Sequence, residues 1–243
     1  MKNQTAPWLL LFGRTALFVI IQSLFALGFF LAGSSSAWVE SETWWMMGVV
    51  VTNFICLAAM MRLFHAEGKN YWDIFRIDRK NVKSDLLALF GIMLLLGPVS
   101  MLPNIILANW LFGSPEIAVQ FLIRPLPFWA TYSGMILFSV TQGMVELALY
   151  FAYIMPRLFT TNEGARPSWL ALSFSALMLG LQHFAIPVSS NINGILWHGL
   201  MFIPFAFLAG IVLRWRPRLL PYMAIIHALM DLSFAMMLLP VAY

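Results

Sequence analysis

Five ionisable side chains lie inside apolar stretches in the second half of this 243-residue chain. They are Glu146, His183, His198, His227 and Asp231. Ionisable groups are costly in hydrocarbon, so they usually face the interior of a helix bundle and mark a functional site. In a dry, preorganised pocket, a carboxylate beside imidazoles can take a proton from water, and a second imidazole can stabilise an oxyanion. This set of residues therefore indicates hydrolysis of a peptide bond inside a membrane.

The spacing of these residues limits which of them can meet. His227 and Asp231 are four residues apart, so they stack on one face of a helix. Counted at about 1.5 Å per residue from the basic helix ends, Glu146 lies about 17 Å deep, His227 about 12 Å and Asp231 about 18 Å. These three are predicted to meet at one level. The same count puts His183 and His198 at roughly 25 Å, which leaves their approach to Glu146 open.

Simpler explanations exist for some of these residues taken alone. A single polar group in a helix bundle is often an interhelical hydrogen-bond donor, which is the simpler explanation for His198. His183 precedes "FAIP" at the end of a span, where it is either interfacial or functional. The pair His227/Asp231 can be a structural hydrogen bond. Glu146 is the hardest to explain structurally, because a carboxylate in lipid needs a proton, a cation or a function.

The elements that must position these residues are membrane helices. Hydrophobic residues make up 61% of the chain and charged residues 10%, with a mean hydropathy of +0.84. Soluble domains are about a quarter charged. Long apolar runs predict spanning helices, because a helix satisfies its own backbone hydrogen bonds in lipid. We expect an all-α, polytopic integral membrane bundle of about 7–8 transmembrane helices in a single domain, with residues 1–125 as N-terminal scaffold spans.

Seven apolar runs support this prediction. They cover residues 8–32, 44–61, 84–112, 128–155, 168–184, 193–213 and 219–239. If the N-terminus is cytoplasmic, all but one of the 14 Lys and Arg residues fall on the inner side, including Lys2 and Arg14, and only Arg124 falls outside. This asymmetry follows the positive-inside rule. The net charge of +4 is then explained by topology and lipid headgroups, without a nucleic-acid partner.

Several other kinds of site find no support in the sequence. The single cysteine, Cys56, provides neither a disulfide framework nor a cysteine metal site. No H-E-x-x-H or G-x-S-x-G motif occurs, and Asp231 has no second intramembrane aspartate for an aspartyl mechanism. The apolar N-terminal run is longer than the core of a signal peptide, so it predicts a retained anchor helix.

Three short motifs occur in order along the fourth, fifth and seventh of these apolar runs. In "ELALYFAYIMPRL", Glu146 and Tyr150 take the places of the first glutamate and the aromatic residue of an E-E-x-x-F-R-G stretch. "LGLQH" places His183 in an F-x-x-x-H motif, and "HALMD" places His227 and Asp231 in an H-x-x-x-N/D motif. Residues 125–240 therefore resemble the CAAX prenyl protease and bacteriocin-processing (CPBP) family of intramembrane glutamic endopeptidases.

The resemblance implies a mechanism and a setting. Glu146 and His183 would activate water, His227 and Asp231 would form the oxyanion site, and neither a metal nor another cofactor would be needed. The implied fold is an all-helical membrane bundle around a cavity. The implied partners are a protein or peptide substrate in or near the membrane and the lipid bilayer. The implied location is a bacterial inner membrane, and the distribution of Lys and Arg predicts a cytoplasmic N-terminus.

Two positions depart from the family pattern and keep other functions open. Leu147 and Phe151 stand where the family has its second glutamate and its arginine. Losing both partners of an ion pair can be neutral for the fold, but it removes groups that would tune Glu146. One alternative is therefore a catalytically impaired relative that acts as an immunity factor or a partner-binding membrane protein. Another is a metal-dependent protease or ion carrier, because Glu, His and Asp can ligate a divalent cation. Neither the substrate nor the oligomeric state follows from the sequence.

Overall fold

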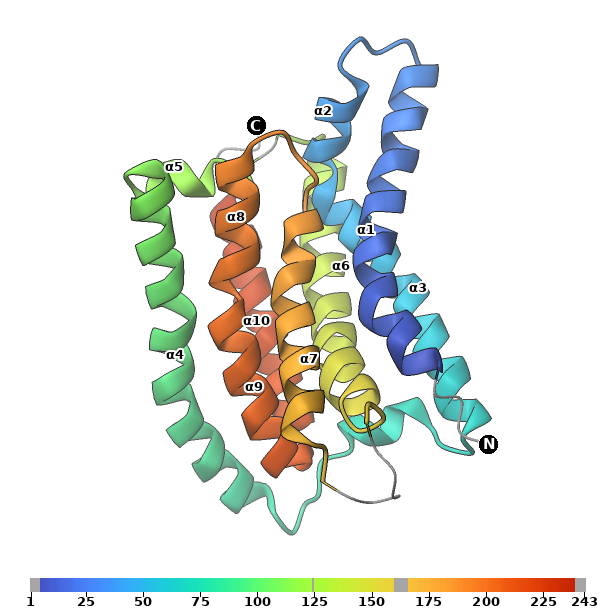
Figure 1. Ribbon diagram of the computed structural model, residues 1–243, viewed down its shortest axis with the longest axis vertical. Helices are drawn as coiled ribbons and strands as arrows, with labels where there is room; N and C mark the ends of the chain where they lie inside the picture. The colour runs from blue at the N-terminus through green and yellow to red at the C-terminus, as the bar shows by residue number, and fades with distance from the viewer. Residues whose placement is uncertain (1–4, 124, 160–165, 239–243) are drawn as a thin grey trace.

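A computed structural model describes residues 5–123, 125–159 and 166–238 of the chain. All regular secondary structure in these residues is helical. Six helices are long and apolar enough to cross a membrane, and they lie side by side along the long axis of the molecule (Figure 1). The prediction of an all-α membrane bundle is therefore confirmed.

The predicted number of about 7–8 spans was slightly too high. Six segments of the described chain meet the length and hydropathy expected of a span, and the apolar run at 168–184 forms a shorter stretch, Trp169–Ala185. At about 1.5 Å per residue this stretch is about 26 Å long, less than the hydrocarbon thickness of about 30 Å. The stretch is apolar enough for a span but short for a straight one.

The elements follow one another with short connections. In chain order they are α1 (Thr5–Leu31), α2 (Ala37–Thr43), α3 (Trp45–Ala66), η1 (Tyr71–Phe75), α4 (Val82–Phe112), α5 (Pro115–Val119), α6 (Phe128–Leu147), η2 (Ala148–Ile154), α7 (Trp169–Leu181), η3 (Gln182–Ala185), α8 (Ile192–Met201), α9 (Ile203–Trp215), η4 (Pro217–Leu219) and α10 (Leu220–Leu238).

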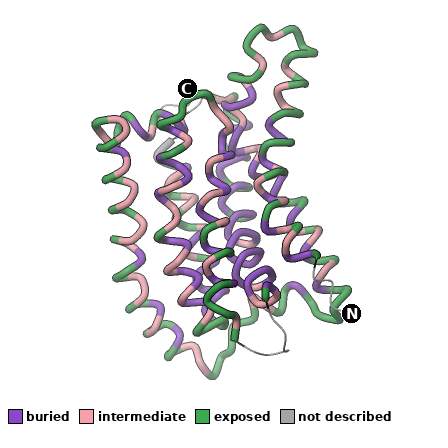
Figure 2. The backbone as a smooth tube through the Cα atoms, in the orientation of Figure 1, coloured by how far each residue is buried: buried purple, intermediate pink, exposed green. Residues whose placement is uncertain are grey.

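The centre of the bundle is α6 together with its continuation η2 (Figure 2). In the span Phe128–Ile154, 72% of the apolar window is buried inside the protein, against 6% for α4. Both α3 and α10 pack against α6, while α7 packs against α9, and α4 packs against α8 and α9. As a result α4 forms the outer edge of the bundle (Figure 1), and side chains on α6 are surrounded by several helices.

The helix that carries Glu146 changes its winding just after that residue. It is α-helical to Leu147 and continues as a π-helix, η2, without leaving the core. Such π segments are rare and are frequent at functional sites. Leu147 and Phe151 are buried in the hydrophobic core at 0% and 3% exposure, and the Phe151 ring lies against Gly210 of α9. Both positions are therefore filled by apolar packing.

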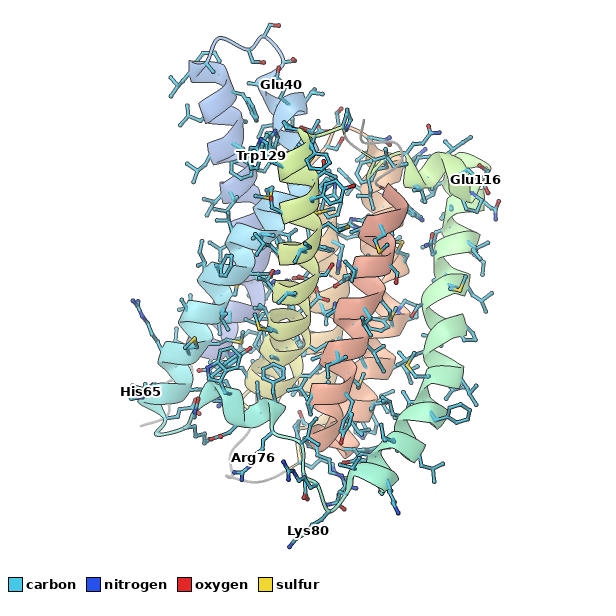
Figure 3. All side chains as sticks on the ribbon, turned by 180° about the vertical axis from the view of Figure 1, so that it is seen from behind. Glu40, His65, Arg76, Lys80, Glu116 and Trp129 are labelled. Atoms are coloured by element: carbon cyan, nitrogen blue, oxygen red, sulfur yellow. The ribbon has the colours of Figure 1, made fainter. Side chains whose placement is uncertain are left out.

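The two ends of the bundle carry different charges. Arg76 and Lys80 lie at one end, whereas Glu40 and Glu116 lie at the other (Figure 3). Arg218, just before α10, reaches Asp85 near the start of α4, with its Nε 2.7 Å from Asp85 Oδ1. Basic residues from distant parts of the chain are thus gathered at one end, as expected of the cytoplasmic end of a membrane protein.

Arg14 does not belong to that basic end, so its assignment to the cytoplasmic bases was wrong. It lies about 14 Å along α1 from Thr5, and its side chain is 0% exposed. The positive-inside rule describes bases in loops and at helix ends, and Arg14 lies in the middle of an apolar span. Lys2 and Arg124, which the same count placed on opposite sides, lie outside the described residues.

An ion pair at the basic end joins α3 to the segment that follows η2. Arg157 Nε lies 2.7 Å from Glu67 Oε1, and Arg157 Nη2 lies 2.5 Å from Glu67 Oε2. Nη1 of the same arginine donates to the main-chain oxygens of Ala152 and Tyr153. The hydrogen bond from Arg157 lowers the pKa of the Glu67 carboxyl below its ordinary value. The pair therefore ties the end of the central helix to α3.

We expect Glu67→Gln to lower the free energy of unfolding by about 1 kcal/mol at neutral pH, as for a partly exposed bidentate pair. The pKa of Glu67 is lower in the folded than in the unfolded protein. The pair therefore stabilises the fold above the unfolded-state pKa, and this contribution is lost as the pH falls through the folded-state pKa. Denaturant titrations in detergent should show the difference at neutral pH and none in acid.

The control for this prediction is Lys69→Met, which removes a more exposed partner of Glu67 whose Nζ lies 3.4 Å away. It should change the free energy of unfolding less than Glu67→Gln does, because exposed single contacts contribute little. A loss for Glu67→Gln that is equal at neutral and acid pH would contradict an ionic origin.

Candidate active site

Four of the five ionisable residues come together in the middle of the bundle. His227 Nε2 lies 3.0 Å from Glu146 Oε2 and 3.4 Å from Asp231 Oδ2. His183 Nε2 lies 3.9 Å from Glu146 Oε1. The depth count anticipated the meeting of Glu146, His227 and Asp231. His183 joins them as well, because that count assumes straight helices that all run perpendicular to the membrane.

Burial differs across this cluster. Glu146 is 1% exposed, and both His183 and His227 are buried. The Asp231 side chain is 20% exposed. The cluster therefore reaches the surface of the bundle at Asp231 on α10, while the Glu146 carboxylate lies at its closed end.

The tautomer of neutral His183 follows from its main-chain contacts. Its Nδ1 lies 3.0 Å from the oxygen of Leu179 and 3.1 Å from that of Gly180. Carbonyl oxygens only accept, so Nδ1 carries the proton and Nε2 has a free lone pair. The ring stacks on Phe202 with centroids 4.1 Å apart. His183 therefore presents a hydrogen-bond acceptor towards Glu146.

His198 packs against His183 and donates a hydrogen bond to its main chain. Its Nδ1 lies 3.2 Å from the main-chain oxygen of His183 and donates to it, and the two rings meet edge to face at 5.3 Å. Phe121 and Phe202 pack against the same ring. This arrangement fits the simpler explanation of His198, a buried hydrogen-bond donor between helix segments.

His227 keeps hydrogen-bonding capacity for another molecule. Its ring stacks on Phe205 at 5.9 Å. Its Nε2 lies between the carboxylates of Glu146 and Asp231, so the proton belongs on that nitrogen. Within the described part of the chain, neither ring nitrogen of His227 has a partner with hydrogen-bond geometry, and the same holds for Asp231 Oδ2. Buried polar groups normally have such partners, so these atoms are available to a ligand.

A buried arginine from the first helix contacts Glu146. Arg14 Nη1 lies 3.3 Å from Glu146 Oε1. Arg14 Nη2 lies 2.9 Å from Asn53 Oδ1 on α3 and 2.9 Å from Gln142 Oε1 on α6. The first part of the chain, which was predicted to be scaffold, therefore also contributes a charged group to this cluster.

Two glutamines complete the surroundings of the carboxylate. Gln142 Nε2 and Gln182 Nε2 each lie 2.7 Å from Glu146 Oε1. Tyr150 donates to Gln182 Oε1 at 3.0 Å, which holds that amide in place. With Arg14, the oxygen Oε1 accepts from three donors, whereas Oε2 faces His227.

Four of these groups, Arg14, Asn53, Gln142 and Gln182, were not predicted to belong to the site, although the sequence carries some signals for them. Gln142 precedes Glu146 by four residues and so shares its helix face. Gln182 is the direct neighbour of His183. Arg14 and Asn53 are polar residues inside apolar runs, which marks them as interior to a bundle but does not identify their partners.

Close packing of α6 against α10 brings Glu146 and His227 together. A Cβ at Gly143 would lie 2.7 Å from both the Ala224 oxygen and the Ala228 Cβ. Real side chains do not approach so closely, so only glycine allows this separation of the two helices. Gly143 lies one turn before Glu146, and Ala224 lies one turn before His227. The distance between the carboxylate and the imidazole therefore depends on this glycine.

We expect Gly143→Ala to lower the free energy of unfolding by about 1–3 kcal/mol, the usual cost of overpacking a tight core. Gly91→Ala on α4 is the matched control, because no atom other than those of its chain neighbours and its own helix backbone lies within 4 Å of its Cβ position. That change should be neutral or stabilising by up to about 1 kcal/mol, from helix propensity. Denaturant titrations in detergent compare the two variants. Equal effects at both positions would contradict the tight α6–α10 contact.

Comparisons with protein-family models, curated proteins and solved structures found no match to this chain. Among residues 5–123, 125–159 and 166–238, no three His, Cys, Asp or Glu side chains form a group that could hold a metal ion. The arrangement that can do chemistry is a carboxylate between two imidazoles, with a second carboxylate beside one of them.

Proposed function

We propose that the chain is an intramembrane endopeptidase that hydrolyses a peptide bond with water activated by Glu146. The observation that carries this proposal is the contact of one buried carboxylate with two imidazoles inside a membrane bundle, at 3.0 Å to His227 and 3.9 Å to His183. It is supported by the motifs around these residues, which resemble those of the CPBP glutamic endopeptidases.

Glu146 acts as the general base through Oε2. The other oxygen, Oε1, already accepts hydrogen bonds from Arg14, Gln142 and Gln182. Its acceptor sites are therefore occupied, and Oε2 is the oxygen left to take up a proton. A water molecule between Glu146 and His183 gives a proton to Oε2 and a hydrogen bond to the free Nε2 of His183. The water oxygen then attacks the carbonyl carbon of the scissile peptide bond.

His227 stabilises the tetrahedral intermediate. Its Nε2–H donates to the oxyanion, which is worth most in a preorganised site that excludes water. An ionised carboxylate cannot donate a hydrogen bond to the oxyanion. The role of Asp231 is therefore to orient the imidazole of His227, which lies 3.4 Å away. When the C–N bond breaks, the proton held by Glu146 passes to the leaving nitrogen. One water is consumed, and one new carboxyl terminus and one new amino terminus are formed.

The same proposal includes the orientation of the protein. The basic end of the bundle, with Arg76 and Lys80, faces the cytoplasm (Figure 3), because positive loops are retained on that side. Helix α1 begins at this end as well (Figure 1), which supports a cytoplasmic N-terminus. The membrane is a bacterial inner membrane, the setting of the proteins that the motifs resemble.

Substrate trapping tests the proposed function. The Glu146→Gln protein, purified from membranes, should retain an uncut polypeptide that the wild-type protein releases. Added wild-type protein should cut that polypeptide, and a metal chelator should not stop it. Loss of cleavage in chelator would favour the metal-dependent alternative. No polypeptide retained above the wild-type level would contradict the proposal.

A second candidate is a non-catalytic membrane protein that binds a partner, for example as an immunity factor. One observation favours it: Arg14 and Glu146 are 0% and 1% exposed, and a buried pair of this kind also occurs as a purely structural contact. This candidate predicts that cells with Glu146→Gln keep the wild-type phenotype. The endopeptidase predicts that they lose it.

A further inference from the structure

Arg14 contacts Glu146 across a separation of 132 residues in the sequence. It is fully buried, and an arginine in a span is retained only where it is paired. The cation at Glu146 therefore comes from α1. It does not come from position 151, where the CPBP pattern has an arginine and this chain has Phe151. The position of Phe151, by contrast, is occupied by an apolar ring packed against α9.

The hydrogen bonds around Arg14 all run in one direction. Arg14 only donates, so the amide oxygens of Asn53 and Gln142 point towards it. The amide nitrogen of Gln142 then points towards Glu146, and that of Asn53 towards Thr141. Reversing either amide would place its nitrogen against the guanidinium. The charge of Arg14 therefore fixes the orientation of two side-chain amides, Asn53 on α3 and Gln142 on α6. The amide of Gln142 in turn donates to Glu146.

The guanidinium also matches this site in shape. Two of its nitrogens reach three acceptors: Nη1 contacts Glu146, and Nη2 contacts Asn53 and Gln142. The planar fork of arginine presents its donors in a fixed arrangement, whereas lysine offers one compact ammonium group. A lysine can supply the positive charge here but cannot make the same set of contacts.

We infer that Arg14 is the positioning residue of Glu146: it keeps the carboxylate ionised and anchors Oε1, so that Oε2 faces His227. A carboxyl group in an apolar interior takes up a proton unless a cation or donors stabilise its charge. Among the described residues, the other charged or titratable groups near Glu146 are His183 of η3, His227 of α10 and Tyr150 of η2, with Asp231 next to His227. Arg14 is the one permanent cation among them.

The catalytic consequence of this inference rests on the proposed function, because only an ionised Glu146 can take a proton from water. The positioning itself does not rest on it. Infrared spectroscopy separates the two, since it distinguishes an ionised carboxylate from a protonated carboxyl group without any substrate. Subtracting the spectrum of the matching Glu146→Gln protein isolates the band of this one side chain.

The experiment compares wild type, Arg14→Lys and Arg14→Gln at neutral pH in lipid nanodiscs. The expected result is an ionised Glu146 in wild type and in Arg14→Lys, and a protonated Glu146 in Arg14→Gln. Arg157→Gln, which removes a base at the end of the bundle, is the control and should leave Glu146 ionised. An ionised Glu146 in Arg14→Gln, or a protonated one in wild type, would overturn the inference.

A second variant decides the case in which Arg14→Gln does not fold. Arg14→Gln/Glu146→Gln has no unpaired carboxylate, so it should fold if Arg14 serves Glu146. Its failure to fold would show that Arg14 serves helix packing, and would overturn the inference. If the infrared result holds while no cleavage is found, the proposed function fails and the role of Arg14 stands.

Discussion

Glu146→Gln is expected to lower the rate of peptide-bond cleavage by about 10²–10⁴-fold, the usual contribution of a general base. The amide has the shape of the carboxylate and keeps one oxygen that can accept from Gln142 and Gln182. It cannot take up a proton from water. The measurement is single-turnover cleavage of the polypeptide that the variant retains, with wild-type and variant proteins in the same lipid.

Two controls make this result specific. Glu67→Gln removes a carboxylate at the end of the bundle and should cleave at the wild-type rate. Glu146→Gln leaves the buried Arg14 without its anion, so its fold is checked against Arg14→Gln/Glu146→Gln, in which both charges are absent. Wild-type cleavage by Glu146→Gln would show that Glu146 is not the base.

Breaking the buried ion pair from the other side should have the largest effect on stability. We expect Arg14→Met to lower the free energy of unfolding by about 3–5 kcal/mol, because Glu146 loses its cation and has to take up a proton to stay buried. Arg14→Met/Glu146→Gln should lose less than the sum of the two single changes. Denaturant titrations of wild type, both single variants and the double variant give the coupling energy.

A coupling energy of at least about 1 kcal/mol is the expected value for residues in one buried network. Each single variant leaves one member of the pair without its partner, whereas the double variant removes both members. Additive losses, with a coupling energy near zero, would contradict a stabilising contact between Arg14 and Glu146. The same cycle with Arg157 and Glu67 should give a smaller value, because that pair is partly exposed.

The helices were predictable because they follow local rules. A long apolar run must form a helix in lipid, whatever lies next to it. The number of spans was predicted less well, because Trp169–Ala185 is apolar but too short for a straight crossing. The pair His227/Asp231 was predictable for the same local reason, since residues four apart share a helix face.

The contacts of Glu146 depend on tertiary structure and were only partly predictable. His183 was placed too deep, because depth along the chain ignores how helices tilt. Arg14 was assigned to the cytoplasmic side by a rule for bases in loops, and its partner lies 132 residues away. Leu147 and Phe151 suggested that Glu146 had lost its charged companion. The structure shows a cation on Glu146 that comes from a different helix.

The most direct test of the central claim is mass spectrometry of the products formed from the trapped polypeptide in ¹⁸O-labelled water. The account predicts two fragments whose masses add up to the polypeptide plus one water, with the label in the new carboxyl terminus. Wild-type protein should form them and Glu146→Gln should not. Fragments that appear equally with both proteins, or a polypeptide that neither protein cuts, would contradict water activation by Glu146.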